Sequence, residues 1–410
     1  MQTEAISGFT PYQRFIIAIL GLLQFTIVLD FMIISPLGDI LMKSLDINTA
    51  QFGLIVSAYA FSAAISGIMA AGFADRFDRK KLLLFFYTGF LLGTVSCGMA
   101  DSFTQLLAAR IVTGLFGGVI GAVSLAIVAD LFRPDQRGRV MSVIQMGFAG
   151  SQVLGIPLGL FLANRWTWHA TFLMIAAFGL LIGLAVLLNM QPVTAHLDNR
   201  TDKNPLLHLW HTLLNKRYQT GFLATTFLPV GGFMLMPFGS AFIINNLLLT
   251  QEDLPLIFML SGISSIIIMP MIGRLSDRVD RFKLFAAGSV LSMIMVLIYT
   301  HLPPVPLWLL IMVNMIMFMG IMSRIIPAVA LNTSIPEMHD RGAYMSISAS
   351  LQQMAGGVAA MAAGLIVFQP HPHSPIEHYP RLGWVVTTVV LVCIWLVYRV
   401  SLIVKQPATK

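Results

Sequence analysis

Charged side chains are scarce in this chain of 410 residues: only 10% are Asp, Glu, Lys or Arg, whereas 57% are hydrophobic and the mean hydropathy is +0.82. This composition supplies too few polar groups to cover a water-soluble globule of this size, which places the chain in a lipid bilayer. The net charge of +7 fits the excess of Lys and Arg in cytoplasmic loops of membrane proteins. It gives no reason to expect a nucleic-acid partner.

Cysteine is also rare. The two cysteines, Cys97 and Cys393, lie inside apolar runs without the spacing of a metal site, so we interpret them as core residues. The sequence contains no Gly-x-Ser-x-Gly, no phosphate-binding glycine loop with lysine and no His-Glu-x-x-His. We therefore expect neither an enzyme nor an ATP-driven pump, and no cofactor or metal site.

Long apolar runs are abundant. Reading runs of roughly 18 or more residues as membrane spans gives six before and six after a polar segment. The spans cover about 15–38, 50–74, 82–100, 103–131, 140–163, 169–190, 220–249, 253–273, 284–302, 305–334, 340–368 and 382–403. We predict an N-terminal six-helix bundle at 1–190, a cytoplasmic linker at 191–219 and a C-terminal six-helix bundle at 220–410.

Internal repeats relate the two halves. The stretch Asp75–Leu82 returns 202 residues later as Asp277–Leu284, with six of the eight positions identical. In the same way, Arg137–Ser142 returns as Arg341–Ser346. Two parallel copies of one unit are typical of secondary transporters, whose substrate site lies between the repeats.

The positions of Lys and Arg predict the orientation. Of the 25 such residues, Lys43, Arg165 and Arg381 fall on the outer side and Arg110 and Arg324 within spans, which leaves 20 on the cytoplasmic side if the N-terminus is inside. Because cytoplasmic loops are enriched in Lys and Arg, we expect both termini in the cytoplasm.

The repeated loop resembles a motif of the major facilitator superfamily, Gly-x-x-x-Asp-Arg-x-Gly-Arg-(Arg/Lys), which joins helices 2 and 3 of that fold. Here the motif runs from Ala71 to Lys80, with Ala71 and Asp78 in the two glycine positions. A second copy starts at Gly273 and has Asp280 in the second position. The resemblance covers nearly the whole chain and implies a fold of 12 membrane helices in two pseudo-symmetric bundles.

In this family the loop latches the two halves together in the outward-facing state. Asp75 and Arg79 are four residues apart on one helical face, and Asp130 at the end of the fourth span can reach Arg79. A role in membrane orientation alone is the alternative, because the basic residues would fix topology in any case. The expected cytoplasmic gate comprises Asp75, Arg76, Arg79, Asp130, Asp277, Arg278 and Arg281.

Asp30 is the one acidic residue deep within a predicted span. It lies ~12 Å below the outer surface and Arg110 ~10 Å below it, at 1.5 Å per residue. Either charge alone would cost at least about 2.5 kcal/mol in the bilayer, so we expect the two to pair. Arg110, Gly114 and Gly118 also resemble the Arg-x-x-x-Gly-x-x-x-Gly of the family's fourth helix. In proton-coupled members a helix 1 acid facing this arginine carries the proton, which implies that role for Asp30; a structural ion pair is the alternative.

Arg324 lies ~15 Å from the cytoplasmic end of the tenth span, with no intramembrane acid left to pair with. It either holds an anionic or carbonyl-bearing substrate or bonds to backbone carbonyls loosened by Pro327. The methionines around it, among them Met317, suit a cavity for varied apolar ligands but are also ordinary filling of a membrane helix. We predict a substrate site that includes Asp30, Thr26, Met317 and Arg324.

Small residues predict close helix packing in two spans. Gly114 and Gly117 follow Arg110 on one face of the fourth span, where a neighbouring helix can approach. The fifth span resembles an antiporter motif that contains Gly-Pro-x-x-Gly, although Ile156 separates the glycine from Pro157. Its small residues recur every fourth position, at Gly147, Ser151, Gly155 and Gly159.

The leading interpretation is a proton-coupled exporter of small apolar or amphipathic compounds, similar to the 12-helix drug/proton antiporter branch. The alternatives are a proton symporter or facilitator for an organic anion or nutrient, and a transporter of lipids or lysolipids. A membrane receptor without transport would not need the intramembrane charges. The partners expected are a small-molecule substrate, protons and the bilayer, for a monomer in the cytoplasmic (inner) membrane of a bacterium.

Overall fold

The computed structural model describes residues 9–73, 76–194, 197, 205–337, 339–371 and 373–405. Within these residues the protein is helical, apart from one isolated β-bridge between Phe368 and Glu377. The all-α fold class predicted from the sequence is therefore confirmed.

The first half of the chain contains α1 (Pro11–Ile33), α2 (Gly38–Ser44), α3 (Thr49–Phe73), α4 (Arg79–Gly98), α5 (Phe103–Leu131), α6 (Pro134–Gly150), a π-helical segment (Ser151–Gly155), α7 (Ile156–Arg165) and α8 (Trp168–Asn189). After α9 (Pro205–Leu214), the second half contains α10 (Lys216–Phe227), α11 (Val230–Asn245), α12 (Leu254–Arg278), α13 (Arg281–Thr300), α14 (Leu307–Asn332), α15 (Arg341–Ile366) and α16 (Tyr379–Lys405).

Twelve stretches of the described chain are long and apolar enough to cross a membrane. Two of them are composite: α6, the π-helical segment and α7 form one, and α10 and α11 form another. The predicted spans correspond to these twelve. The clearest differences lie where charged residues lower the local hydropathy, since α6 begins at Pro134 and α10 at Lys216, several residues before the predicted starts.

The second acid of each repeated loop begins the helix that follows it. Asp78 is the N-cap of α4 and accepts a hydrogen bond from the Lys80 amide at 3.0 Å. Asp280 is the N-cap of α13 and accepts one from the Lys283 amide at 3.1 Å. An N-cap carboxylate satisfies amides that have no partner inside the helix, which gives a local reason for acids where the family motif has glycine.

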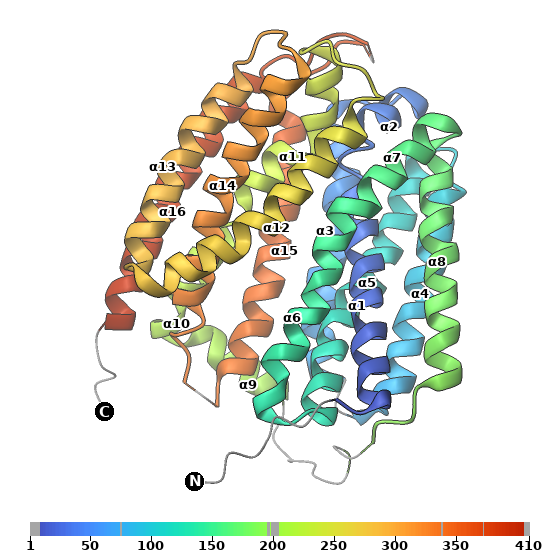
Figure 1. Cartoon of the computed structure of the whole chain (residues 1–410), viewed down its shortest axis with the longest axis vertical. Coiled ribbons are helices and arrows are strands. Elements are labelled where there is room, and N and C mark those ends of the chain that lie inside the picture. The colour runs from blue at the N-terminus through green and yellow to red at the C-terminus, as the bar shows by residue number, and fades with distance from the viewer. Residues whose placement is uncertain are drawn as a thin grey trace.

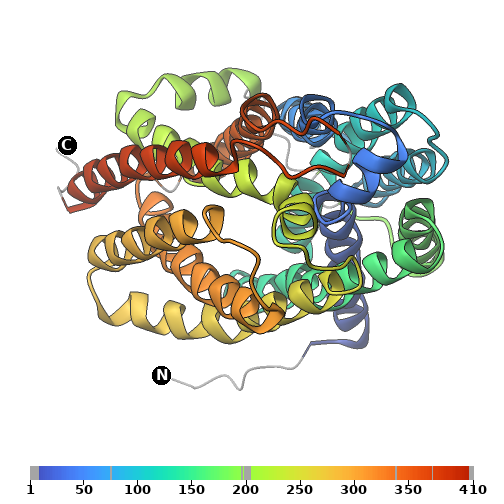
Figure 2. The same ribbon diagram turned by 90° about the horizontal axis from the view of Figure 1, so that it is seen from above.

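The helices form two groups side by side, one from each half (Figures 1 and 2). The most extensive packing between the halves is α3 against α15, with further contacts of α7 with α12 and α2 with α11. Helix α1 begins and α16 ends at the same end of the molecule, and α2 lies at the opposite end (Figure 1). We call these the basic end, since Arg76, Arg133, Arg278 and Arg341 lie there, and the α2 end.

Among the described residues, the apolar cluster that both halves share lies toward one end of the molecule. One cluster contains residues of both halves near the α2 end, such as Leu37, Phe52, Phe238 and Phe242. Toward the basic end, the first half has its own cluster around Ile16 to Val193 and the second half has another. The halves therefore share an apolar cluster at the α2 end and have separate clusters toward the basic end, where α3 and α15 still contact each other: a Cβ at Gly67 would lie 3.5 Å from Ser350 Oγ.

Two short helices were not predicted. Helix α2 follows the first span, and α9 lies within the segment read as a polar linker. The charged residues on either side of 205–214 lowered the apparent hydropathy of that segment, although its own sequence is amphipathic. Helix α9 packs against α15 and α3 and so contacts both halves.

Candidate functional site

Helices α1 and α5 bring Asp30 and Arg110 together inside the first half. Arg110 Nη1 donates to Asp30 Oδ2 at 2.8 Å and to the Asp30 carbonyl oxygen at 3.2 Å. The Thr94 hydroxyl of α4 donates to the other carboxylate oxygen, Oδ1, at 3.1 Å. Both charged side chains are 0% exposed, so the ion pair is closed off from solvent on every side in this conformation.

The rest of the Arg110 guanidinium has little polar compensation. Its carbon lies 4.6 Å from the ring centroid of Tyr59, on α3, in a cation–π contact. Its Nε and Nη2 have no hydrogen-bond partner within the described chain. Asp30 is thus the only anion bonded to this buried cation in the described residues. Any change in the charge of Asp30 acts directly on Arg110.

Glycines on α5 allow α3 to approach the arginine. A Cβ at Gly114 would collide with the Ser62 hydroxyl and would lie 2.9 Å from Tyr59 Cα. One at Gly117 would lie 2.7 Å from the Tyr59 hydroxyl. Gly121, four residues after Gly117, has open space around it, since nothing lies within 4 Å of a Cβ built there.

The small residues of the fifth span face α1, the helix that carries Asp30. A Cβ at Gly147 would meet the Gly21 carbonyl oxygen and the Phe25 amide, and one at Gly155 would lie 2.8 Å from Leu29 Cδ1. Gly159 lies against Ile33 in the same way. Pro157 is half-buried just beyond the π-helical segment.

The other predicted substrate residues occupy different places: Thr26 lies one turn before Asp30 on α1, whereas Met317 and Arg324 lie on α14 in the second half. Thr26 is fully buried, and its hydroxyl is 3.2 Å from the Tyr87 hydroxyl of α4 and donates to the Leu23 carbonyl at 2.9 Å. Arg324 is 6% exposed, its Nε has no partner in the described chain, and it lies against the Cys393 thiol of α16. Met317 is half-buried against the core at the α2 end. Thr26 is therefore next to the ion pair along α1, while Arg324 and Met317 are in the other half of the molecule.

Of the gate residues, Arg79 and Asp130 form an ion pair, with Nε 3.1 Å from Oδ2. Asp75 lies outside the described residues, and Arg76 is exposed. The second copy is built differently. Its Asp277 and Arg278 are exposed and Arg281 is half-buried.

Asp280 is bonded within the second half. It accepts a hydrogen bond from Lys405 Nζ, at the end of α16, at 3.0 Å. That bond, with the Lys283 amide, holds the pKa of Asp280 below its ordinary value. The ion pair of Arg79 with Asp130 and that of Asp280 with Lys405 thus each connect residues of a single half.

A polar network at the α2 end joins the two halves. Asp39, which is 1% exposed, accepts hydrogen bonds from Asn245 Nδ2 at 2.6 Å and Gln251 Nε2 at 3.1 Å. Lys43 Nζ lies 2.8 Å from Asp39 Oδ2 and donates to Asn245 Oδ1 at 3.2 Å. We call these four residues the α2-end network.

Further hydrogen bonds between the halves lie at the same end. The Ser240 hydroxyl donates to the Ser35 carbonyl at 3.0 Å, and the Thr49 hydroxyl to the Val367 carbonyl at 2.9 Å. Asn164 also bonds the Gln251 carbonyl, at 2.9 Å. Together with the network, these bonds fasten the first half to the second at the α2 end.

Sequence reasoning missed the α2-end network and the contacts of Thr94 and Tyr59. The spacing of Asp39 and Lys43, four residues apart after Pro36, was a usable signal for a short helix with an internal ion pair. Thr94 and Tyr59 carry no comparable signal. Within the described chain, no group of His, Cys, Asp and Glu is arranged to hold a metal ion.

Comparison with known proteins gives one consistent family. The model of the Major Facilitator Superfamily matches residues 20–361 and 221–408. The uncharacterized MFS-type transporter YbcL of Bacillus subtilis (strain 168) is 25% identical over 352 residues, which cover 86% of this chain and 88% of YbcL.

Solved structures agree on the fold. A bacterial homologue of the human lysosomal transporter Spinster, inward-facing and unoccupied, matches with a TM-score of 0.80 and 17% identity over 97% of this chain and 98% of its own. A D-xylose–proton symporter matches with a TM-score of 0.77 and 16% identity over 95% and 98% of the two chains.

Proposed function

Because the chain belongs to the major facilitator superfamily, whose members are transporters, we propose that it couples proton movement to the efflux of small apolar or amphipathic compounds. Transport then proceeds by alternating access, with the substrate between residues 1–190 and 220–410 and with 191–219 as the connection. Both termini face the cytoplasm and the protein works as a monomer in a bacterial inner membrane. The excess of Lys and Arg in the loops at the basic end supports this orientation.

The buried Asp30–Arg110 pair is the observation that carries the proposal. Protonation of Asp30 removes the charge that compensates Arg110, and an uncompensated buried charge is unfavourable by about 3–5 kcal/mol. Since Nε and Nη2 already lack partners in the described chain, the arginine has to move or find a new partner. A proton can therefore drive a rearrangement between α1, α3, α4 and α5, the helices that contact the pair.

The complete burial of the pair supports a carrier whose access to protons changes with conformation. In the present conformation the halves share a core and a polar network at the α2 end and have separate cores toward the basic end. We infer an inward-facing state in which Asp30 is sealed from both sides. The outward-facing state must break the α2-end network, and Asp30 then gains access to a proton.

A proton symporter or facilitator of an organic anion or nutrient is the second candidate. The observation that favours it is Arg324, a buried cation whose Nε lacks a hydrogen-bond partner in the described chain. One structural neighbour is a D-xylose–proton symporter, and the same fold serves either direction of coupling. The direction of substrate movement under an imposed pH gradient separates the two candidates, and labelled lysolipid in the same assay tests lipid transport.

The test of coupling is Asp30→Asn in reconstituted vesicles. The amide resembles the protonated carboxyl in size and charge, so we expect substrate-for-substrate exchange to continue while accumulation driven by a pH gradient is lost. The matched control is Asp101→Asn, an exposed acid at the α2 end. If Asp30→Asn still concentrates substrate when only a proton gradient is supplied, Asp30 is not the coupling residue and the ion pair is structural.

A further inference from the structure

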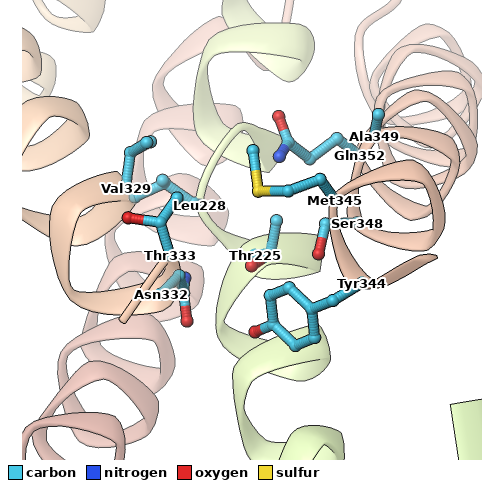
Figure 3. Close-up of a pocket in the computed structure, with 10 residues that line it drawn as sticks. All are labelled: Thr225, Leu228, Val329, Asn332, Thr333, Tyr344, Met345, Ser348, Ala349 and Gln352. Atoms are coloured by element: carbon cyan, nitrogen blue, oxygen red, sulfur yellow. The ribbon is translucent and has the colours of Figure 1, made fainter. Parts of the chain in front are cut away.

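A small pocket lies inside the second half, between α10, α14 and α15 (Figure 3). Its volume is about 90 Å³, which exceeds the roughly 10–15 Å³ that one buried water needs. The residues that line it come from the end of α10 and from the parts of α14 and α15 nearest the basic end: Thr225, Leu228, Val329, Asn332, Thr333, Tyr344, Met345, Ser348, Ala349 and Gln352.

Three polar atoms of the pocket wall have no hydrogen-bond partner in the described chain. They are Asn332 Oδ1, the Tyr344 hydroxyl and Ser348 Oγ, and their side chains are only 6%, 1% and 5% exposed. The Tyr344 hydroxyl faces the hydroxyls of Ser348 and Thr225 without the geometry of a hydrogen bond. Buried polar atoms are nearly always bonded, so three such atoms around one pocket indicate a missing partner.

The chemistry of the wall restricts that partner. No Asp, Glu, Lys, Arg or His is among the lining residues, so a charged ligand would lack a counter-ion there. Hydroxyl and amide groups both donate and accept. The remainder of the wall is apolar, from Leu228, Val329 and Ala349, and Met345 is 44% exposed beside it. The matching ligand has an uncharged polar group on an apolar body.

We propose that this pocket binds the hydroxyl or amide end of a neutral amphipathic compound. The site lies in the half that does not contain the Asp30–Arg110 pair, toward the basic end, where each half has its own apolar cluster. It is therefore a subsite for a compound that approaches from the basic end. As a substrate subsite it rests on the transport function proposed above, whereas binding itself does not require proton coupling.

The experiment uses four probes with nearly the same skeleton: benzyl alcohol and benzamide, which are neutral, and benzoate and benzylamine, which are charged at neutral pH. Met345→Cys places a thiol at the pocket, and the native Cys97 and Cys393 are buried. The rate at which a hydrophilic maleimide modifies the introduced thiol is measured in the full-length protein in nanodiscs. We expect the two neutral compounds to slow modification and the two ions to have no effect.

Two variants in the same background test the unpartnered groups. Tyr344→Phe and Ser348→Ala each remove an oxygen that has no partner in the described chain, so neither should lower the melting temperature. Each should weaken protection by about 2- to 10-fold, the effect of one hydrogen bond. Ser346→Ala, on the same helix but outside the pocket wall, is the matched control. In this variant the probes should protect the introduced thiol as strongly as in the Met345→Cys parent.

Equal protection by all four probes, or by none of them, overturns the proposal; in the second case the pocket holds water only. A lower melting temperature in Tyr344→Phe together with unchanged protection overturns it as well, because the hydroxyl is then structural. Asp30→Asn separates this inference from the proposed function. Protection that persists in Asp30→Asn supports the pocket whether or not that variant loses proton coupling, so a failure of the coupling mechanism leaves the pocket standing.

Discussion

Arg324 is a buried cation whose single side chain distinguishes the two candidate functions. If it binds an anionic substrate, Arg324→Lys should keep part of the transport and Arg324→Ala should lose it, because lysine keeps the charge without the planar fork. Uptake of labelled organic anions into vesicles is the measurement. Cys393→Ala, which removes the thiol beside the guanidinium, is the control and should transport normally. Normal anion transport by Arg324→Ala would assign the arginine a structural role.

At the level of single residues, the sequence predicted which charged residues pair more successfully than it predicted the uncharged residues that contact them. The depths of Asp30 and Arg110 follow from the rise of a helix and from the energy of an isolated charge in lipid, and the two residues do pair. Thr94 and Tyr59 could not be predicted, since uncharged residues of their type fit on any face of a membrane helix. The role of Asp39 was missed because an acidic residue at the end of a membrane span does not require an ion-pair partner. Its position in the sequence therefore gave no reason to expect the network.

Among the helices, the approach of α3 to α5 depends on the absence of a side chain at Gly114. Gly114→Ala would push its new methyl group into the Tyr59 backbone and the Ser62 hydroxyl. Overpacking of this kind destabilises by about 1–3 kcal/mol, so we expect a lower melting temperature and weaker coupled transport. Gly121→Ala is the matched control, because nothing lies within 4 Å of a Cβ there. Equal melting temperatures for the two variants would contradict the packing argument.

The long helices were predictable because hydrophobic length determines them. Helices α2 and α9 were not, since short amphipathic helices take their stability from the surfaces they touch, here α11 for α2 and α15 with α3 for α9. The small residues of the fifth span predicted a close contact. Which helix makes that contact, α1, became known only from the arrangement of the bundle.

For the molecule as a whole, the α2-end network should stabilise the present conformation. Asp39→Asn weakens the bond to Lys43 and removes a charge-assisted acceptor for Asn245 and Gln251, so we expect a shift toward the outward-facing state. Spin labels on Asp135 and Arg341, exposed residues at the basic end, should then show a shorter distance by pulsed EPR. Asp101→Asn, at the α2 end but outside the network, should leave the distance distribution unchanged. An unchanged distribution in Asp39→Asn would remove the network from the gate.

The loop motif makes the opposite prediction for Asp75. If the loop latches the outward-facing state, Asp75→Asn should leave the protein folded and inserted and favour the inward-facing state. The same pair of spin labels should report a larger population at long distance, most clearly in the Asp39→Asn background, where the outward-facing state is enriched. No change in that background would leave the loop with a role in membrane orientation only.

The repeat predicted two related halves, and the family match confirms the fold. The sequence could not predict at which end the halves share their core, because the same sequence adopts both states of an alternating-access protein. The two states differ only in their populations. The residues that join the halves here, such as Asp39 and Asn245, belong to no repeated motif. They become recognisable only when both halves are placed together.

The π-helical segment between α6 and α7 amounts to one extra residue in an otherwise regular helix. Pro157 has no amide hydrogen for the Val153 carbonyl and its ring clashes with that group, which favours a wider turn. Gly262 of α12 lies close to this turn, since a Cβ there would be 3.1 Å from the Gln152 carbonyl carbon. Because this wide turn holds one residue more than an α-helical turn, a deletion of Val153 can be absorbed there by a return to regular α-helix. Deleting a residue of α7 ahead of Gly159 would instead rotate everything beyond it by about 100° and turn Gly159 away from α1. This span should therefore accept a change of length within the π-helical segment more readily than in the helices on either side of it.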